Sequence, residues 1–312
     1  MFSRLLASAT GPRQSTGARL LERLGTATQI DDRREAISDF KELSAAEPIR
    51  LIDKGGMSVL VQLLAEEDTQ ITRDTLETLS NLVDAEVPKN TEDPDNKVGT
   101  KAAHNATVFL AHDANLVAVL HSSQDNDLYV RFHAVQLAMK LLTGGSRLRT
   151  QDAMLQQPTT VGHVLDLASD QREIVRNEVL LLLAKLSAGS AGLQNILAFQ
   201  GAFDQLLGII EAEASGEAGI GSVIVHDCLQ IIGRLLERNG SSCRFFRESG
   251  ALSRLPPLLV LPASHTKGHA TTARLACEVI SRLLAAGEGF EDDEDEDVGA
   301  GGGVDEGRTG AA

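Results

Sequence analysis

The fold is decided by residues 174–186, which read IVRNEVLLLLAKL. Apolar side chains at positions 0, 4, 7 and 11 of a repeating pattern form one stripe of a helix. Here that stripe consists of Val175, Val179, Leu182 and Leu186. Further leucines fall outside the stripe, namely Leu180, Leu181 and Leu183. A helix that is apolar nearly all round is expected to be buried on several sides, as it would be inside a stack of repeats.

The same stripe recurs along the chain. Clear copies begin at Val130 and Val225, and weaker copies begin at Thr72 and Thr272. Successive copies begin 45 to 58 residues apart. This spacing is close to the period of about 40–47 residues that is typical of armadillo and HEAT repeats.

Most copies are followed by a glycine turn and a shorter helix that ends in paired leucine or isoleucine residues. Glycine suits a sharp reversal because it tolerates positive φ. The glycines expected in these turns are Gly55, Gly56, Gly162, Gly201 and Gly250. We therefore predict an all-α fold, an armadillo-type helical repeat solenoid of about five to six repeats. An antiparallel helical bundle is the alternative, and the glycine turns favour the solenoid.

Composition suggests three segments. Residues 1–21 contain three arginines and no acid, which fits either a flexible opening or an organelle transit peptide. Residues 22–286 carry the repeats, with an inserted polar loop predicted at 85–105. Residues 287–312 are acidic and Gly-rich, with seven consecutive acids at 291–297, so this tail is predicted to be disordered.

The last copy of the stripe has no following repeat to cover it. A solenoid needs a polar cap where its stacking stops. We therefore expect the apolar side chains of this helix, Leu275, Val279 and Leu283, to be exposed beside the acidic tail.

Charge and cysteine usage narrow the class of protein. The net charge is −15, and most of it lies in the tail. The rest of the chain is mildly acidic and shows no basic stripe of the kind that binding to nucleic acid usually requires. No apolar run approaches the ~18 residues of a membrane-spanning helix. The three cysteines, Cys228, Cys243 and Cys277, lack close spacing and are typical of reduced thiols in a cytosolic protein.

Sequence motifs for catalysis are absent. The chain contains no phosphate-binding G-x-x-x-x-G-K-[ST] loop and no G-x-S-x-G motif. His265 and His269 have a ligand-like spacing but no cysteine pair accompanies them. We therefore expect a non-enzymatic protein with no cofactor, no metal and no small-molecule substrate.

One charged patch is the candidate site for binding a protein partner. It consists of Glu173, Arg176, Asn177 and Glu178, beside the apolar stripe of residues 174–186. Solenoids bind partners through extended surfaces that span several repeats. The alternative interpretation is an ordinary solvated helix face.

Four separated blocks, in order, resemble one family. They are residues 31–37 (DDRREAI), 172–183 (REIVRNEVLLLL), 194–203 (QNILAFQGAF) and 225–229 (VHDCL), the last followed by a polar turn and a Phe. They resemble the general vesicular transport factors, a family of vesicle-tethering golgins, over roughly residues 20–285. Four matches in order are more specific than a generic armadillo pattern.

The resemblance implies the armadillo-like head domain of a cytosolic protein that is recruited to Golgi and transport-vesicle membranes. Such proteins tether vesicles in traffic from the endoplasmic reticulum to the Golgi and within the Golgi. The partners it implies are Rab-type small GTPases, SNAREs and other golgins. The family also begins with a short segment rich in Ser and Gly, which favours a flexible opening over a transit peptide at residues 1–21.

The sequence departs from the family pattern near residue 285. The family's head continues into further repeats, a long coiled coil and an acidic end, whereas this chain has no heptads. It reads either as a truncated product or as a paralogue that keeps half of the head. The alternative function is a generic armadillo adaptor for a ubiquitin ligase or a cargo. A nuclear carrier would show repeated Trp and Asn, and the chain contains no Trp.

Overall fold

A computed structural model of the protein describes residues 16–46, 53–86, 97–143, 146–217, 219–261 and 266–286. Within these ranges every regular element is a helix, which confirms the all-α prediction. The α-helices are α1 (Thr16–Thr26), α2 (Ile30–Ala46), α3 (Lys54–Leu63), α4 (Thr69–Val83), α5 (Lys97–Phe109), α6 (Asp113–Ser122), α7 (Leu128–Thr143), α8 (Arg147–Leu155), α9 (Pro158–Asp166), α10 (Glu173–Leu186), α11 (Ala191–Phe199), α12 (Ala202–Ala214), α13 (Val223–Leu235), α14 (Gly240–Glu248) and α15 (Lys267–Ala285). Three short 3₁₀ helices complete the fold: η1 (Leu167–Ser169), η2 (Ala251–Arg254) and η3 (Pro256–Leu259).

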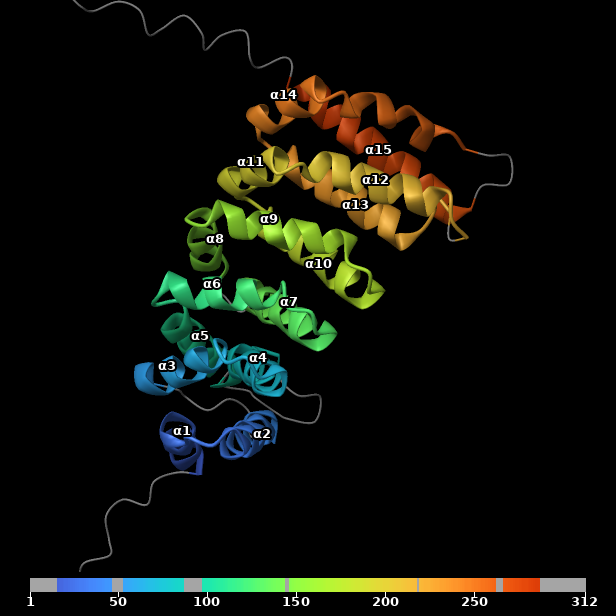
Figure 1. Cartoon of the computed structure of the whole chain (residues 1–312). Coiled ribbons are helices and arrows are strands. Elements are labelled where there is room, and N and C mark those ends of the chain that lie inside the picture. Colours follow the sequence, from blue (N-terminus) through green and yellow to red (C-terminus); the bar gives the residue numbers. More distant parts are fainter. Residues whose placement is uncertain are drawn as a thin grey trace, which may run out of the picture.

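The helices stack as repeats along one axis (Figure 1). The last helix of each repeat packs on the last helix of the next, so that α2, α4, α7, α10, α13 and α15 form one continuous series. We call this row the third-helix series. Shorter first and second helices flank it: α9 packs on α10, and α8 packs on α7 and α9. This arrangement confirms the armadillo-type solenoid.

The predicted stripe is the core of the stack. Copies of the stripe lie on α4, α7, α10, α13 and α15. In α7 and α10, its residues Val130, Leu137, Val175 and Leu182 are fully buried. Burying one such aliphatic side chain contributes about 1.5–3 kcal/mol. The buried side chains of successive repeats join into one cluster that runs from Leu24 to Leu283, so each repeat is stabilised by its neighbours.

Two of the predicted glycine turns are present, and the other predicted glycines lie in helices. Gly201 and Gly250 have φ angles of 90° and 79° and begin α12 and η2, as expected for a left-handed reversal. In contrast, the pair Gly55 and Gly56 lies in the first turn of α3, and Gly162 lies inside α9. These glycines are helical because a side-chain cap from Asp53 and a proline at the start of α9 begin those helices instead.

Two segment boundaries need correction. Helix α1 begins at Thr16, so the end of the predicted flexible segment 1–21 is helical. Helix α5 begins at Lys97, so the predicted loop at 85–105 is too long. Its residue Asn105 is buried and donates from Nδ2 to the Leu82 carbonyl oxygen over 2.8 Å. The predicted acidic tail, 287–312, lies outside the described residues.

The burial of two helices differs from expectation. In α15, Leu275, Val279 and Leu283 are buried against α13 and η3, so the predicted exposed stripe is wrong. The large apolar side chain that α15 exposes is Leu284. In α10, Ile174 and Leu181 are 52% and 49% exposed, so this helix is not covered on all sides.

Candidate partner-binding surface

The helices of the third-helix series are fastened at their first turns by polar side chains. Arg176, the fourth residue of α10, donates from Nη1 to the carbonyl oxygens of Asp170 and Gln171, over 2.8 Å and 3.2 Å. Arg131, the fourth residue of α7, holds the turn before its own helix in the same way, through the carbonyl oxygen of Asp125. Arg176 therefore stabilises the turn before α10, which is a structural role that the sequence did not indicate.

Several of these polar side chains also reach the next repeat. Arg131 pairs with Asp170, with Nε 2.8 Å from Oδ2 and Nη2 3.2 Å from Oδ1. Burial of the Asp170 carboxyl would raise its pKa, but hydrogen bonds from Arg131 and from the backbone N–H of Arg172 outweigh burial and lower the pKa. Similar links join α2 to the turn before α4 through Arg33 and Glu66, and α13 to α15 through His226 and Thr272.

Among the described residues, no hydrogen bond or ion pair of a side chain joins the first turn of α10 to α13. The two helices are joined near their other ends, where Arg234 donates from Nη1 to the Ala184 carbonyl oxygen over 2.7 Å. The first turns of α10 therefore leave side chains available at the surface.

The structure places the other predicted site residues on these turns. Glu173 and Asn177 are exposed, and Glu178 is half-buried, so that desolvation raises the pKa of its carboxyl. Ile174, Asn177, Glu178 and Leu181 follow the spacing of one helix face and expose apolar and polar groups side by side. The prediction missed Ile174 and Leu181 because it treated every apolar residue here as core.

A matching apolar side chain lies on the neighbouring helix. Tyr129 of α7 is 53% exposed and precedes the stripe of α7 by one position, as Ile174 precedes the stripe of α10. Tyr129 is held by the guanidinium of Arg73, which lies 5.7 Å from its ring centroid. Both Tyr129 and Ile174 stand one residue before the apolar stripe of their helix. This shared position is the sequence signal that could have identified both residues. We call Tyr129, Ile174, Asn177, Glu178 and Leu181 the α7–α10 surface.

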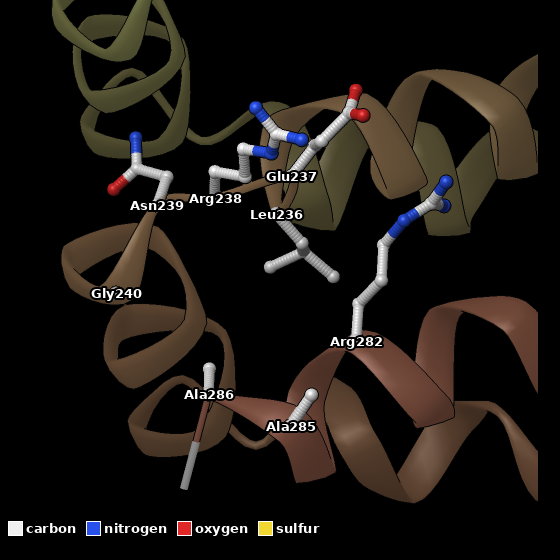
Figure 2. A pocket seen from close by; sticks show the side chains of 8 residues that line it. All are labelled: Leu236, Glu237, Arg238, Asn239, Gly240, Arg282, Ala285 and Ala286. Carbon is white, nitrogen blue, oxygen red and sulfur yellow. The ribbon is translucent and has the colours of Figure 1, made fainter. Parts of the chain in front are cut away.

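Two adjoining cavities lie at the far end of the series. A groove of about 430 Å³ runs between α13 and α15. A second cavity of about 460 Å³, which we call the α14 pocket, lies where α13, α14 and α15 meet (Figure 2). The two cavities share Glu237 and Arg282. The α14 pocket is lined by Leu236, Glu237, Arg238, Asn239, Gly240, Arg282, Ala285 and Ala286.

The described part of the chain offers few side chains suited to catalysis or metal binding. Burial raises the pKa of the Cys228 thiol to about 12, and burial also raises the pKa of Cys243, so neither thiol is an activated nucleophile. No cluster of three metal-ligating side chains occurs within the described ranges. None of the helices described combines the length and the apolar character that crossing a bilayer requires.

The stacked repeats and the exposed α7–α10 surface define a repeat protein of the armadillo type. Residues 47–84 match the family model of the armadillo/beta-catenin-like repeat. The crystal structure of Uso1-1 superposes with a TM-score of 0.70 at 22% identity, covering 85% of this chain and 44% of that one. This likeness supports the fold.

Curated relatives identify the family. The human general vesicular transport factor p115 is 30% identical over 255 residues, which is 80% of this chain and 26% of that protein. Golgin candidate 6 of Arabidopsis thaliana is 33% identical over 220 residues, 68% of this chain and 23% of that protein. The chain belongs to the family of vesicular transport factors that includes p115 and Uso1, which confirms the resemblance. It spans about a quarter of the length of these relatives.

Proposed function

We propose that this chain is a non-enzymatic scaffold for vesicle tethering and docking, in transport from the endoplasmic reticulum to the Golgi and within the Golgi. The observation that carries the proposal is its homology with vesicular transport factors over 80% of its own length. A solenoid suits this role because its stacked repeats present a long, rigid surface to other proteins.

We propose the α7–α10 surface as the site at which a protein partner binds. It exposes Tyr129, Ile174 and Leu181, and large apolar side chains surrounded by polar ones are typical of protein interfaces. The proposed partner class is a Rab-type small GTPase, with SNAREs and golgins as further partners. Through them, a cytoplasmic chain would be held at the periphery of Golgi and vesicle membranes.

A binding measurement on the full chain tests this proposal. A Golgi Rab-type GTPase, loaded with GTP or GDP, is titrated onto the immobilised chain, and tighter binding of the GTP form is expected. The double substitution Ile174→Asp, Leu181→Asp should weaken binding at least tenfold, because it puts two charges into an apolar contact. The matched control is Leu148→Asp, Val260→Asp, two similarly exposed apolar residues outside the surface.

Two results would count against the proposal. Equal affinity of both variants would remove the α7–α10 surface from consideration. A lack of binding to Golgi GTPases, SNAREs and golgins alike, with binding to a ubiquitin ligase subunit or a transport cargo, would favour the generic adaptor.

A further inference from the structure

The two cavities at the end of the series are rich in arginine, although the chain carries a net charge of −15. Four arginines line them against two glutamates: Arg234, Arg238, Arg274, Arg282, Glu237 and Glu278. Arg274 pairs with Glu278. Within the described ranges, no ion pair engages Arg238 or Arg282. Figure 2 shows these two side chains on the rim of the α14 pocket with Glu237 between them.

Each of the two arginines is associated with an unusual backbone feature. Arg238 has a φ of 52° and is the one non-glycine residue with positive φ in the described part of the chain. Such a conformation is costly and persists where the surroundings favour it. A Cβ at Gly233 would clash with Nη1 of Arg282. The Arg282 guanidinium therefore occupies space on α13 that is available because residue 233 has no side chain.

The α14 pocket also includes the N-terminus of a helix. Helix α14 begins there with Gly240 and directs the positive end of its dipole at the cavity. The C-terminal ends of α13 and α15 also lie at the pocket, and one carbonyl group of each accepts a hydrogen bond from a side chain. Gln194 donates from Nε2 to the Arg234 carbonyl oxygen over 2.9 Å, and Arg247 donates from Nη1 to the Leu283 carbonyl oxygen over 3.5 Å.

We propose that the α14 pocket binds an acidic peptide segment, and that its occupant is the run of seven acids at 291–297 of this same chain. Ala286 lines the pocket, and Glu291 follows five positions later. Five residues span at most about 17 Å, and both arginines line the same pocket as Ala286. The short tether raises the effective concentration of the acids to the millimolar range, so weak ion pairs suffice for occupancy. This inference does not depend on a role in vesicle transport.

Hydrogen exchange on the full chain tests the proposal. Three proteins are compared at low salt: the unmodified chain, a tail variant with all seven acids replaced by their amides, and Arg238→Gln, Arg282→Gln. The amides of residues 236–242 should exchange at least about threefold more slowly in the unmodified chain than in either variant. The difference should vanish in 1 M NaCl, where the Debye length is about 3 Å.

The control variant Arg19→Gln, Arg172→Gln removes two exposed arginines elsewhere and should keep the protection. Equal exchange in the unmodified chain and the tail variant would overturn the proposal, and this comparison leaves the folded repeats unaltered. Protection that is lost in the tail variant but kept without Arg238 and Arg282 would also overturn it, because the acids would then bind elsewhere. A peptide of residues 288–298, added to the tail variant, should restore the protection.

Discussion

Arg131 shows how single side chains connect neighbouring repeats. Its guanidinium holds the turn before α7 and also pairs with Asp170 in the turn before α10. The side chains of Arg131 and Asp170 are only 14% and 8% exposed. A pair this sheltered is only modestly stabilising as a whole, but removing one partner is costly because the other charge remains buried.

We expect Arg131→Met to lower the free energy of unfolding by about 3 kcal/mol at pH 7, since Asp170 is left without its guanidinium. Methionine keeps much of the apolar stem, so the loss reports on the charge. Urea denaturation measures it. The exposed pair Arg244–Glu248 supplies the control, and Arg244→Met should change stability by less than about 0.5 kcal/mol.

The same variant predicts a change in pH dependence. The pKa of Asp170 is lowered in the folded protein, so its contribution is present above the unfolded pKa of about 3.9 and is lost as the pH falls through the folded value. In Arg131→Met the carboxyl loses the hydrogen bonds from Arg131 and keeps the one from the backbone N–H of Arg172, so burial is opposed less and the pKa of Asp170 is higher than in the unmodified chain. The stability difference between the two proteins should therefore shrink between pH 7 and pH 3. A constant difference over that range would contradict this account of Asp170.

Replacing glycine by alanine at two positions tests the backbone conformation assigned to each. Gly201→Ala should destabilise by about 1 kcal/mol, because φ is 90° there and no neighbouring atom limits a Cβ. Gly208→Ala should stabilise by about 0.5–1 kcal/mol, because Gly208 lies inside α12, where alanine has the better helix propensity. Thermal unfolding of both variants measures these effects. Shifts of the same sign would contradict the assigned backbone conformations.

At the scale of the element, the repeating stripe predicted five helices of the third-helix series and missed α2. Positions equivalent to the stripe in α2 are Arg33, Ile37, Phe40 and Ser44. The first and last of these are polar because they contact α4 and its preceding turn: Arg33 pairs with Glu66, and Ser44 accepts a hydrogen bond from Asn81. Apolar periodicity alone does not detect such a helix.

Helix α15 tests how the end of the stack is stabilised. Leu283 is 3% exposed and its neighbour Leu284 is 68% exposed. Leu283→Glu should cost about 3 kcal/mol or more, because it leaves a cavity and buries a charge, whereas Leu284→Glu should be nearly neutral. Hydrogen exchange should then increase in residues 267–285 while α7 and α10 stay protected. Equal responses to the two substitutions would show that α15 is not packed as described.

At the scale of the whole molecule, the fold was predictable and the binding surface was only partly so. Helical periodicity reports burial, so it located Val130 and Val175 in the core. It does not distinguish an apolar side chain that packs inside from one that a partner would cover, as at Ile174 and Leu181. Nor does it show that Arg176 is engaged by backbone carbonyls six and five positions earlier, a contact that depends on how the turn folds back.

Stacked repeats also predict how the chain opens. Each repeat contacts mainly its neighbours, so stability should behave as a one-dimensional sum of repeats and interfaces. Native-state hydrogen exchange should be slowest in α7 and α10 and should accelerate towards α1 and α15. Exchange that is uniform along the stack, through one global unfolding event, would contradict this expectation.

Over the ranges that the structure describes, the first turn of α10 has no side-chain hydrogen bond or ion pair to α13, and this has a mechanical consequence. Arg131 and Asp170 link the first turn of α7 to the turn before α10, whereas α10 and α13 are joined by Arg234 near their opposite ends. We expect a junction that polar side chains link on one side only to open more easily on the other side. Torque applied to the two ends of the stack would widen this junction on the side of Asn177 and Glu178. The stack would then deform more easily there than at the α7–α10 junction, so a load on the molecule would alter the shape that a partner meets beside the α7–α10 surface.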